Sequence, residues 1–240
     1  MDLVILPQHW SALLCIVIIF GTILIAVIKK WMMTYALIVA NIIIFVITLV
    51  YYDQLIGTIS VNQEQIAFEY AGLGFRPLYL EPSYSPQTYT LFTSMFIHGG
   101  FAHIIGNMLV LFFVGIPFED RIGWKKFLII YLITGMCGSL AHSFLNLDFP
   151  NNYITLVGAS GAIFGIMGAF AFSYPRDEVI MPIPLGIIMI LRRIKVIYAV
   201  ILFAILETVV VFLDVQDNTA HLAHLGGLVV GFILAAILLG

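Results

Sequence analysis

The sequence has 240 residues, of which 62% are hydrophobic and 10% are charged, and its formal net charge is −3. A soluble domain of this length is nearer half apolar and a quarter charged, so the composition excludes an ordinary soluble protein and indicates an integral membrane protein. Lys and Arg together number only ten, and we expect no nucleic-acid partner. Cys15 and Cys137 both lie in apolar runs, and we infer no disulfide from them.

Seven apolar stretches have roughly the 20 residues that a bilayer-spanning helix needs. In chain order they are residues 11–28, 35–52, 96–116, 126–146, 155–172, 196–213 and 221–239. The first does not have the pattern of a secretory signal peptide, because no basic residue precedes it and it ends in Lys29 and Lys30. We therefore expect an all-α fold, a polytopic bundle of membrane helices with no separate soluble domain.

The basic residues indicate how this bundle is oriented. With seven spans the loops alternate between the two membrane faces, and nine of the ten Lys and Arg residues then lie on one face; only Arg76 lies on the other. The positive-inside rule makes the first face cytoplasmic. We expect the N-terminus outside, the C-terminus inside, and a location in a membrane such as the prokaryotic plasma membrane.

Two connections are long. Residues 53–90, on the outer side, contain the Gly- and Pro-marked stretch AGLGFRPLYLEPSYSPQ and are expected to form a folded or membrane-lying loop. Residues 173–195, on the inner side, contain an apolar run that is too short and too often broken by proline to span the bilayer. We expect this second segment to lie along the inner interface.

Four polar residues from three of the predicted helices share one depth. Ser160 is about five residues into its span, roughly 8–10 Å below the outer interface at 1.5 Å per residue. His224 is at a similar depth in the last span, and His103 and Asn107 lie in the outer half of the third. Strongly polar side chains inside a membrane are costly and mark functional cavities. The pattern predicts a shallow polar site open to the outside.

Small residues favour close contact between the two helices that carry Ser160 and His224. Gly161, Gly165 and Ala169 recur every four residues on one helix, and Gly227, Gly231 and Ala235 do so on the other. Stripes of this kind let two backbones approach closely. If the stripes face each other, Ser160 and His224 come within hydrogen-bonding reach.

A serine beside a histidine is the minimal activated nucleophile, because the imidazole accepts the hydroxyl proton and later returns it to the leaving group. The tetrahedral intermediate also needs donors for its oxyanion. His103 and Asn107, at positions i and i+4, share a helix face and can supply them. The backbone N–H of Ser160 is a third candidate donor.

Three motifs resemble those of the rhomboid intramembrane serine proteases. They are GASG at residues 158–161, HGGFAHIIGN at 98–107 and AHLGGLVVG at 223–231. The resemblance covers six helices, from about residue 35 to the end of the chain. It implies a six-helix rhomboid-like catalytic core at residues 35–240, preceded by an N-terminal anchor helix and basic turn at residues 1–34.

The resemblance assigns roles to individual residues. It implies that Ser160 is the nucleophile and His224 the base of a Ser–His dyad, with His103, Asn107 and the Ser160 amide forming the oxyanion hole. Three residues are implied to support the site: Gly158 in the approach to Ser160, His98 near the hole, and Phe164 against the base. The FEDRIG segment at residues 118–123 is implied to be structural. The family often has Trp-Arg in the outer loop, where this sequence has Tyr89-Thr90.

Two other polar features allow more than one interpretation. His221 and His224 form the pair HLAH, a possible half of a metal site, but no acidic residue lies within the motifs and there is no HExxH sequence, so we predict no metal. Glu207 lies in an apolar helix near the depth of Ser160. We favour a structural, hydrogen-bonded acid there; the alternative is a residue that lines the cavity or gates substrate access. No Asp is apparent as a partner for His224.

The sequence therefore predicts an intramembrane serine endopeptidase that needs no cofactor. Its expected partners are single-span transmembrane substrates, cut near the outer membrane face, and the lipid bilayer itself; no oligomeric state is predicted. A multi-span transporter or channel is the alternative, as is a non-catalytic binder of transmembrane helices. A transporter site is expected near the midplane between related halves, whereas this cluster is shallow and no related halves are visible.

Overall fold

The computed structural model describes residues 9–57, 59–62, 65–68, 72–148, 153–185, 188–213 and 219–240. A helix is present in each of the seven predicted spans. Five of these helical segments are long and apolar enough to cross a membrane. They are α1 (Trp10–Lys29), α2 (Met33–Val50), the continuous segment Phe101–Ile122, α7 (Trp124–Phe144) and α10 (His221–Leu238).

The other two predicted spans contain shorter apolar helices, α8 (Ser160–Ser173) and α9 (Val196–Phe212). The 14 residues of α8 extend about 21 Å at 1.5 Å per residue, which is less than the roughly 30 Å thickness of the hydrocarbon core. Residues 153–159 lead into α8 in a largely non-helical conformation. The predicted polytopic helical bundle is confirmed, and its central helix is shorter than expected.

The segment Phe101–Ile122 is one helix with a local widening. It consists of α5 (Phe101–Val110), a π-helical segment η4 (Leu111–Gly115) and α6 (Ile116–Ile122). Pro117 occupies the first turn of α6. Because proline has no N–H to donate to the preceding turn, a local change of hydrogen-bonding pattern before it is expected. Here the widening lies next to α2, and an added side-chain carbon at Gly115 would lie 3.1 Å from Thr34.

Two β-hairpins were not expected from the sequence. The strands β1 (Ile59–Asn62) and β2 (Gln65–Phe68) form one within the long outer connection. The strands β3 (Glu178–Leu185) and β4 (Ile188–Lys195) form the other, paired from Glu178↔Lys195 to Leu185↔Ile188. This second hairpin contains the apolar run predicted to lie along the inner interface. Pairing the two halves satisfies backbone groups that a proline-broken helix would leave unbonded.

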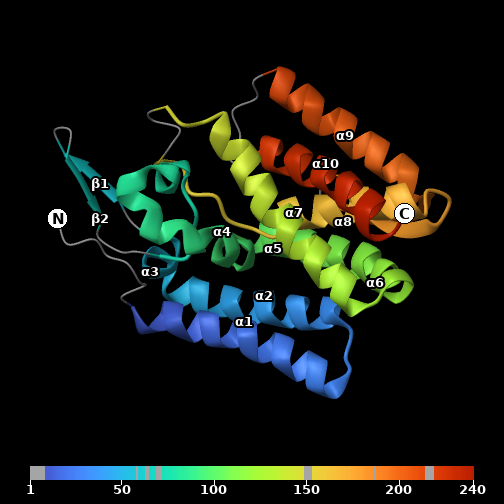
Figure 1. Cartoon of the computed structure of the whole chain (residues 1–240), viewed down its shortest axis with the longest axis horizontal. Helices are drawn as coiled ribbons and strands as arrows, with labels where there is room; N and C mark the ends of the chain where they lie inside the picture. Colours follow the sequence, from blue (N-terminus) through green and yellow to red (C-terminus); the bar gives the residue numbers. More distant parts are fainter. Residues whose placement is uncertain are drawn as a thin grey trace.

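α8 is the central helix of the bundle. Figure 1 shows it beside α7 and α10, with α9 outside α10 and the α1–α2 pair on the opposite side. Every residue of α8 from Gly161 to Ala171 is buried. The described part of the chain between α2 and α5 contains five short helical segments. They are α3 (Tyr52–Ile56), η1 (Pro77–Leu80), η2 (Pro82–Tyr89), α4 (Thr90–Thr93) and η3 (Ser94–Phe96).

The predicted contact between the two glycine stripes is confirmed. A side-chain carbon added at Gly227 would overlap the carbonyl oxygen of Gly161, and one added at Gly231 would overlap that of Gly165. α10 therefore packs backbone to backbone against α8. Because no bulkier residue fits at these positions, the glycines fix the separation of the two helices.

At the end of the bundle that holds the α1–α2 turn, the Glu119 carboxylate caps α2. It accepts hydrogen bonds from the backbone N–H groups of Met33 (2.6 Å) and Thr34 (2.7 Å) and from the Thr34 hydroxyl (2.7 Å). Glu119 is buried, and the side chain of Met32, at the N-cap position, does not cap the helix.

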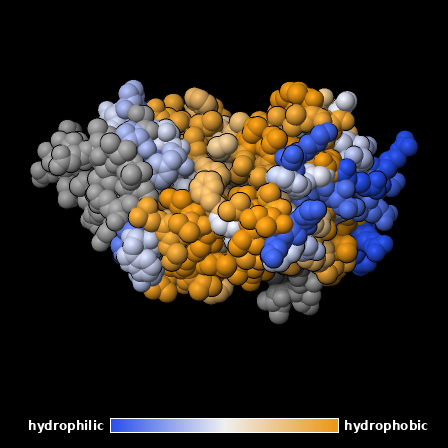
Figure 2. Space-filling model, turned by 60° about the horizontal axis from the view of Figure 1, so that its bottom comes forward, coloured by the Kyte–Doolittle hydropathy of each residue, from blue (hydrophilic) through white to orange (hydrophobic). Residues whose placement is uncertain are grey.

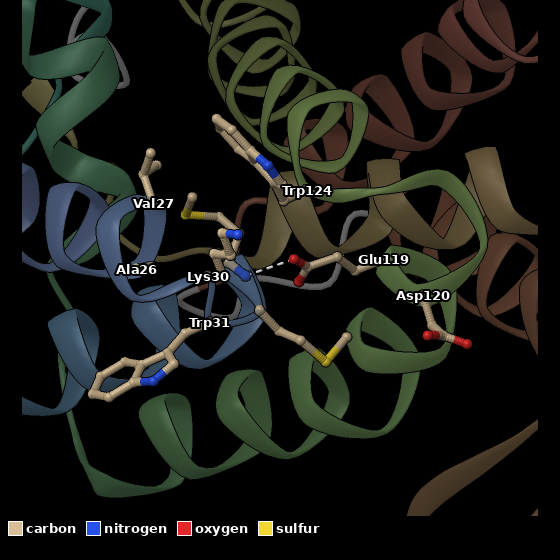
Figure 3. A pocket seen from close by; sticks show the side chains of 9 residues that line it. Ala26, Val27, Lys30, Trp31, Glu119, Asp120 and Trp124 are labelled. Atoms are coloured by element: carbon tan, nitrogen blue, oxygen red, sulfur yellow. Dashed lines mark hydrogen bonds between the residues drawn. The ribbon is translucent and has the colours of Figure 1, made fainter.

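Glu119 also lines a pocket of about 530 Å³ between α1 and α6, together with Lys30, Asp120 and Trp124 (Figure 3). None of the predicted site residues lines this pocket.

The same end of the bundle brings several basic residues together. Arg121 of α6 pairs with Asp177 at 2.8 Å, between α8 and β3, and Lys126 of α7 donates to the Leu238 carbonyl of α10 at 2.9 Å. Hydrophilic side chains gather at one end of the molecule in Figure 2, and an apolar surface covers its middle. Loops expected on one membrane face therefore contact one another.

The opposite end is fixed by Arg76, the single basic residue expected outside. Its side chain is buried and donates hydrogen bonds to the carbonyls of Gly57 and Tyr153 and to the Tyr79 hydroxyl. Its neighbour Phe75 forms an antiparallel bridge with Leu156, which is on the segment that leads into α8. Arg76 and the Phe75–Leu156 bridge thus anchor this loop to the bundle.

Candidate active site

Ser160 and His224 meet across the α8–α10 contact. Ser160 is the first residue of α8, and His224 is in the first turn of α10. The Ser160 hydroxyl oxygen Oγ lies 2.8 Å from the His224 nitrogen Nε2, within hydrogen-bonding distance. The His224 side chain is 9% exposed. The structure thus brings a half-buried hydroxyl and a buried imidazole together.

The position of Ser160 within its helix differs from the sequence-based expectation. Five residues of helix were expected before it, whereas α8 starts at Ser160 itself. The reason is Gly158, whose φ of 117° is unfavourable for any other residue and ends regular structure there. Because the first N–H groups of a helix have no intrahelical acceptor, the amides of Ser160 and Gly161 are left available at the site.

The imidazole of His224 is held between two helices. Phe164, one turn after Ser160 on α8, stacks face to face on it, with ring centroids 4.5 Å apart and planes 6° from parallel. Phe164 in turn contacts Phe203 of α9 edge-on at 5.9 Å. The stacking fixes the plane of the imidazole and leaves both of its nitrogens free to face other partners.

His103 and Asn107 of α5 lie on the other side of the Gly158 segment. A side-chain carbon added at Gly158 would be 2.6 Å from Nε2 of His103 and 3.7 Å from Nδ2 of Asn107. The Asn107 amide nitrogen is buried and has no hydrogen-bond acceptor among the described residues. The side chains of His103 and Asn107, two candidate hydrogen-bond donors, therefore lie near the backbone of Gly158.

His98 packs against His103. Its side chain is completely buried, and its ring packs edge-on against that of His103 at a centroid distance of 4.9 Å. Gly158 is held by its own N–H, which donates to the Ser94 carbonyl at 2.9 Å. All the predicted site residues on α5, α8 and α10 are thereby brought into one region of the fold.

Glu207 of α9 joins the site from a third direction. Its carboxylate oxygen Oε2 lies 2.6 Å from Nδ1 of His221, and Oε1 lies 3.0 Å from Nδ1 of His224. The ligand atoms of these three residues all lie within 4.8 Å of one another, so the group is also able to hold a metal ion. No other group of this kind is found in the described ranges of the chain.

The contact between Glu207 and His224 was not found from the sequence, which showed no Asp partner for the histidine. The available signal was a lone carboxylate at the depth of Ser160 in an apolar helix. Depth alone does not give the rotation of a helix about its axis, and the predicted roles of Glu207 therefore included only a structural acid and a gate.

A family model described as the Rhomboid domain matches residues 85–240. Curated relatives include RHOMBOID-like protein 1 of Arabidopsis thaliana, which is 31% identical over 153 residues that cover 64% of this chain and 35% of the relative. RHOMBOID-like protein 6, mitochondrial, from the same plant is 28% identical over 227 residues, covering 86% of this chain and 68% of the relative.

A bacterial relative, Rhomboid protease GluP of Bacillus subtilis, is 35% identical over 152 residues that cover 63% of this chain and 26% of the relative. The matched region thus spans less than half the length of two of these three relatives. The family model covers well over half of the chain and includes every residue of the site described above. The chain belongs to the rhomboid family.

Proposed function

We propose that the chain is an intramembrane serine endopeptidase that cleaves transmembrane segments of single-span proteins near the outer membrane face. The observation that supports this most strongly is the 2.8 Å separation of Ser160 Oγ and His224 Nε2 on two helices locked together by glycines. Membership of the rhomboid family agrees with it, since a relative in that family is named a protease.

In the proposed reaction, Nε2 of His224 removes the proton from Ser160 as Oγ attacks the carbonyl carbon of the scissile peptide bond. The tetrahedral intermediate collapses when the protonated imidazole returns this proton to the leaving amine. Water then attacks the acyl-enzyme while His224 accepts a proton from it. His224 returns this proton to the Ser160 oxygen, which releases the carboxylic acid product and restores the hydroxyl. No metal or organic cofactor takes part.

The oxyanion hole is proposed to consist of Asn107, His103 and the amide of Ser160. Asn107 offers a buried N–H without an acceptor among the described residues, and the Ser160 amide is free because α8 begins there. The positive end of the α8 dipole also points at this position. Donors that are already fixed in place stabilise the developing charge more than freely reorienting water does.

The substrate has to unwind locally, because a regular helix uses its own carbonyl and amide groups in hydrogen bonds that a protease must open. Small or helix-breaking residues near the cleaved bond are therefore expected to favour cleavage. A shallow site is reached by water from the outer face. We propose that this face is the side opposite Lys30 and Lys126, with the end of α10 inside and the start of α1 outside, in a membrane such as a prokaryotic plasma membrane.

An activity-based fluorophosphonate probe tests this function on the purified protein in detergent or liposomes. We expect the wild-type protein to be labelled and the Ser160→Ala and His224→Ala variants not to be. Ser143→Ala is the matched control, because Ser143 is another helix serine and, among the described residues, its hydroxyl donates only to the backbone carbonyl of Ser139. This control is expected to label at the wild-type rate.

Product analysis decides between the protease and the two alternative classes of protein. Mass spectrometry after incubation with a panel of single-span proteins should find cuts near the outer ends of their helices. A folded sample that neither labels nor cleaves would instead favour a transporter or a non-catalytic binder of transmembrane helices.

A further inference from the structure

Glu207 is the only charged side chain in α9, a helix that is otherwise almost entirely apolar. Its side chain is 12% exposed, so the carboxylate turns into the bundle instead of out toward lipid or solvent. A carboxylate inside a membrane protein is costly unless it is paired. The groups that accompany it are two imidazoles of α10, those of His221 and His224.

The two nitrogens of the His224 imidazole have different partners. Nε2 lies 2.8 Å from Ser160 Oγ, and Nδ1 lies 3.0 Å from Oε1 of Glu207. For Nε2 to accept the serine proton, the neutral ring must carry its own proton on Nδ1. A carboxylate at Nδ1 selects that tautomer, since it accepts a hydrogen bond from Nδ1–H and would repel a lone pair there.

We propose that Glu207 is a positioning residue for His224, so that the proposed Ser160–His224 pair operates as a Ser–His–Glu triad. The inference rests on the proposed function. In the resting state the carboxylate holds the Nδ1–H tautomer, and after proton transfer it stabilises the imidazolium without itself taking the proton. A dyad predicted from three sequence motifs thereby gains a third member from a helix that carries none of them.

His221 contributes by holding the carboxylate. Oε2 of Glu207 is bound to its Nδ1 at 2.6 Å, which leaves Oε1 for His224. The contact with His224 has the distance of an ion pair, and its direction is not yet that of an aligned hydrogen bond. Catalytic hydrogen bonds commonly align and shorten only when substrate binds, so this distance is compatible with the proposed role.

The test compares Glu207→Gln and Glu207→Asp with wild type, with Thr208→Ala as the matched control. Thr208 is the next residue on α9 and is exposed, and within the part of the chain that the structure describes its hydroxyl donates only to the Ala204 carbonyl. For each protein we would measure the rate constant and the amplitude of fluorophosphonate labelling, kcat and KM for a transmembrane substrate, and the thermal unfolding midpoint. Each assay is run with and without a chelator, because Glu207, His221 and His224 are also able to hold a metal ion.

We expect Glu207→Gln to lower kcat and the labelling rate constant at least about tenfold, since the base as a whole contributes about 10²- to 10⁴-fold. KM should stay within about twofold, because Glu207 does not contact the substrate. Glu207→Asp restores the charge and should recover part of the rate, and Thr208→Ala should match wild type.

Three outcomes would overturn the inference. An unchanged rate constant with a lower labelling amplitude means that Glu207 only maintains the fold. An altered KM with normal labelling by the small probe means that it gates substrate access. A loss of wild-type labelling when the chelator is added means that Glu207, His221 and His224 act as a metal site. If Glu207→Gln does not fold, Glu207→Asp decides. Its shorter side chain draws the carboxylate away from Nδ1 of His224, so positioning requires a labelling rate below that of wild type, and an equal rate contradicts it.

The control proteins separate this inference from the proposed function. Labelling of the wild type, together with none in Ser160→Ala, establishes the nucleophile independently of Glu207. If the wild type is not labelled, both the function and the triad fail. If it is labelled and Glu207→Gln labels equally fast, the triad alone fails.

Discussion

Asn107 is the residue whose surroundings most clearly suggest a ligand that is formed only during a reaction. Its amide nitrogen is buried, lies near the Gly158 backbone, and has no acceptor among the residues that the structure describes. Buried donors without a partner cost free energy, so they are rare unless function requires them. An oxyanion next to Ser160 would supply the missing acceptor.

Replacing Asn107 with alanine should therefore lower kcat by about 10²- to 10³-fold, the usual cost of losing one oxyanion donor. KM should change little, because the bond forms in the transition state and not with bound substrate. Steady-state kinetics on a transmembrane substrate would measure both. Asn146→Ala is the control, since its amide already donates to the His142 carbonyl at 2.8 Å; a loss of kcat below threefold in Asn107→Ala would contradict the proposed role.

At the residue scale, the sequence predicted which side chains meet but not every contact between them. The depth argument brought Ser160, His224, His103 and Asn107 together from spacing alone. It could not find the pairing of Glu207 with His224, because that contact depends on how α9 is rotated about its axis. An apolar helix with a single polar residue leaves this rotation undetermined by its own sequence.

At the level of elements, the α8–α10 contact is the one most tightly specified by sequence. Overpacking a well-packed interface costs about 1–3 kcal/mol, and the neighbour here is backbone that cannot rotate away. We expect Gly231→Ala to lower the free energy of unfolding by about this amount and to reduce activity, since the helices that carry Ser160 and His224 are forced apart.

Gly21→Ala on α1 is the matched control for this prediction. An added carbon there has no neighbour within 4 Å, and alanine favours helix over glycine, so stability should stay equal or rise. Unfolding of both variants in mixed micelles would measure the difference. Equal stability in the two variants would show that the glycine contact does not set the helix separation.

The cap of α2 illustrates a long-range contact between elements. Glu119 is 85 residues from Thr34 in sequence and accepts three hydrogen bonds at the start of α2. Losing hydrogen bonds to a charged group costs about 1.5–3 kcal/mol. Glu119→Ala is therefore expected to lower unfolding stability by about that amount, whereas Asp120→Ala, exposed and next to it, should not; thermal unfolding of both variants would measure the effect.

Element positions were predicted better than element ends. Each of the seven apolar stretches contains a helix, because a membrane helix is specified mainly by length and hydropathy. The start of α8 was misplaced, since residues 155–159 are as apolar as the helix itself and only Gly158 marks the boundary. The β3–β4 hairpin was missed for a related reason, because its apolar run has no clear two-residue alternation.

For the molecule as a whole, the distribution of charge gives a prediction about orientation. Basic residues gather at one end of the bundle, and the single basic residue at the other end, Arg76, is buried and fully engaged with carbonyl and hydroxyl oxygens. The asymmetry that the positive-inside rule uses is therefore sharper in the folded protein than in the sequence count.

Cysteine accessibility in intact cells would test this orientation. In a background without Cys15 and Cys137, a membrane-impermeant maleimide is expected to label Leu147→Cys, after α7, and not Lys125→Cys, at the start of α7. Both positions are exposed in the fold, so lysed cells should label at both and serve as the control. The reverse pattern would place the proposed active site on the inner face.

The antiparallel bridge between Phe75 and Leu156 has one more consequence. Two backbone hydrogen bonds, of 3.1 and 2.7 Å, join the outer loop to the chain four residues before Ser160. Only residues 157–159 separate this bridge from Ser160, and they include the bend at Gly158, where φ is 117°. One residue inserted between Leu156 and Ser160 would displace the hydroxyl relative to the His224 imidazole, and a displacement of about 1 Å costs on the order of a hundredfold in rate. The pairing of this loop with the segment before α8 thus helps to set the position of the Ser160 hydroxyl, although the loop lies far from Ser160 in sequence.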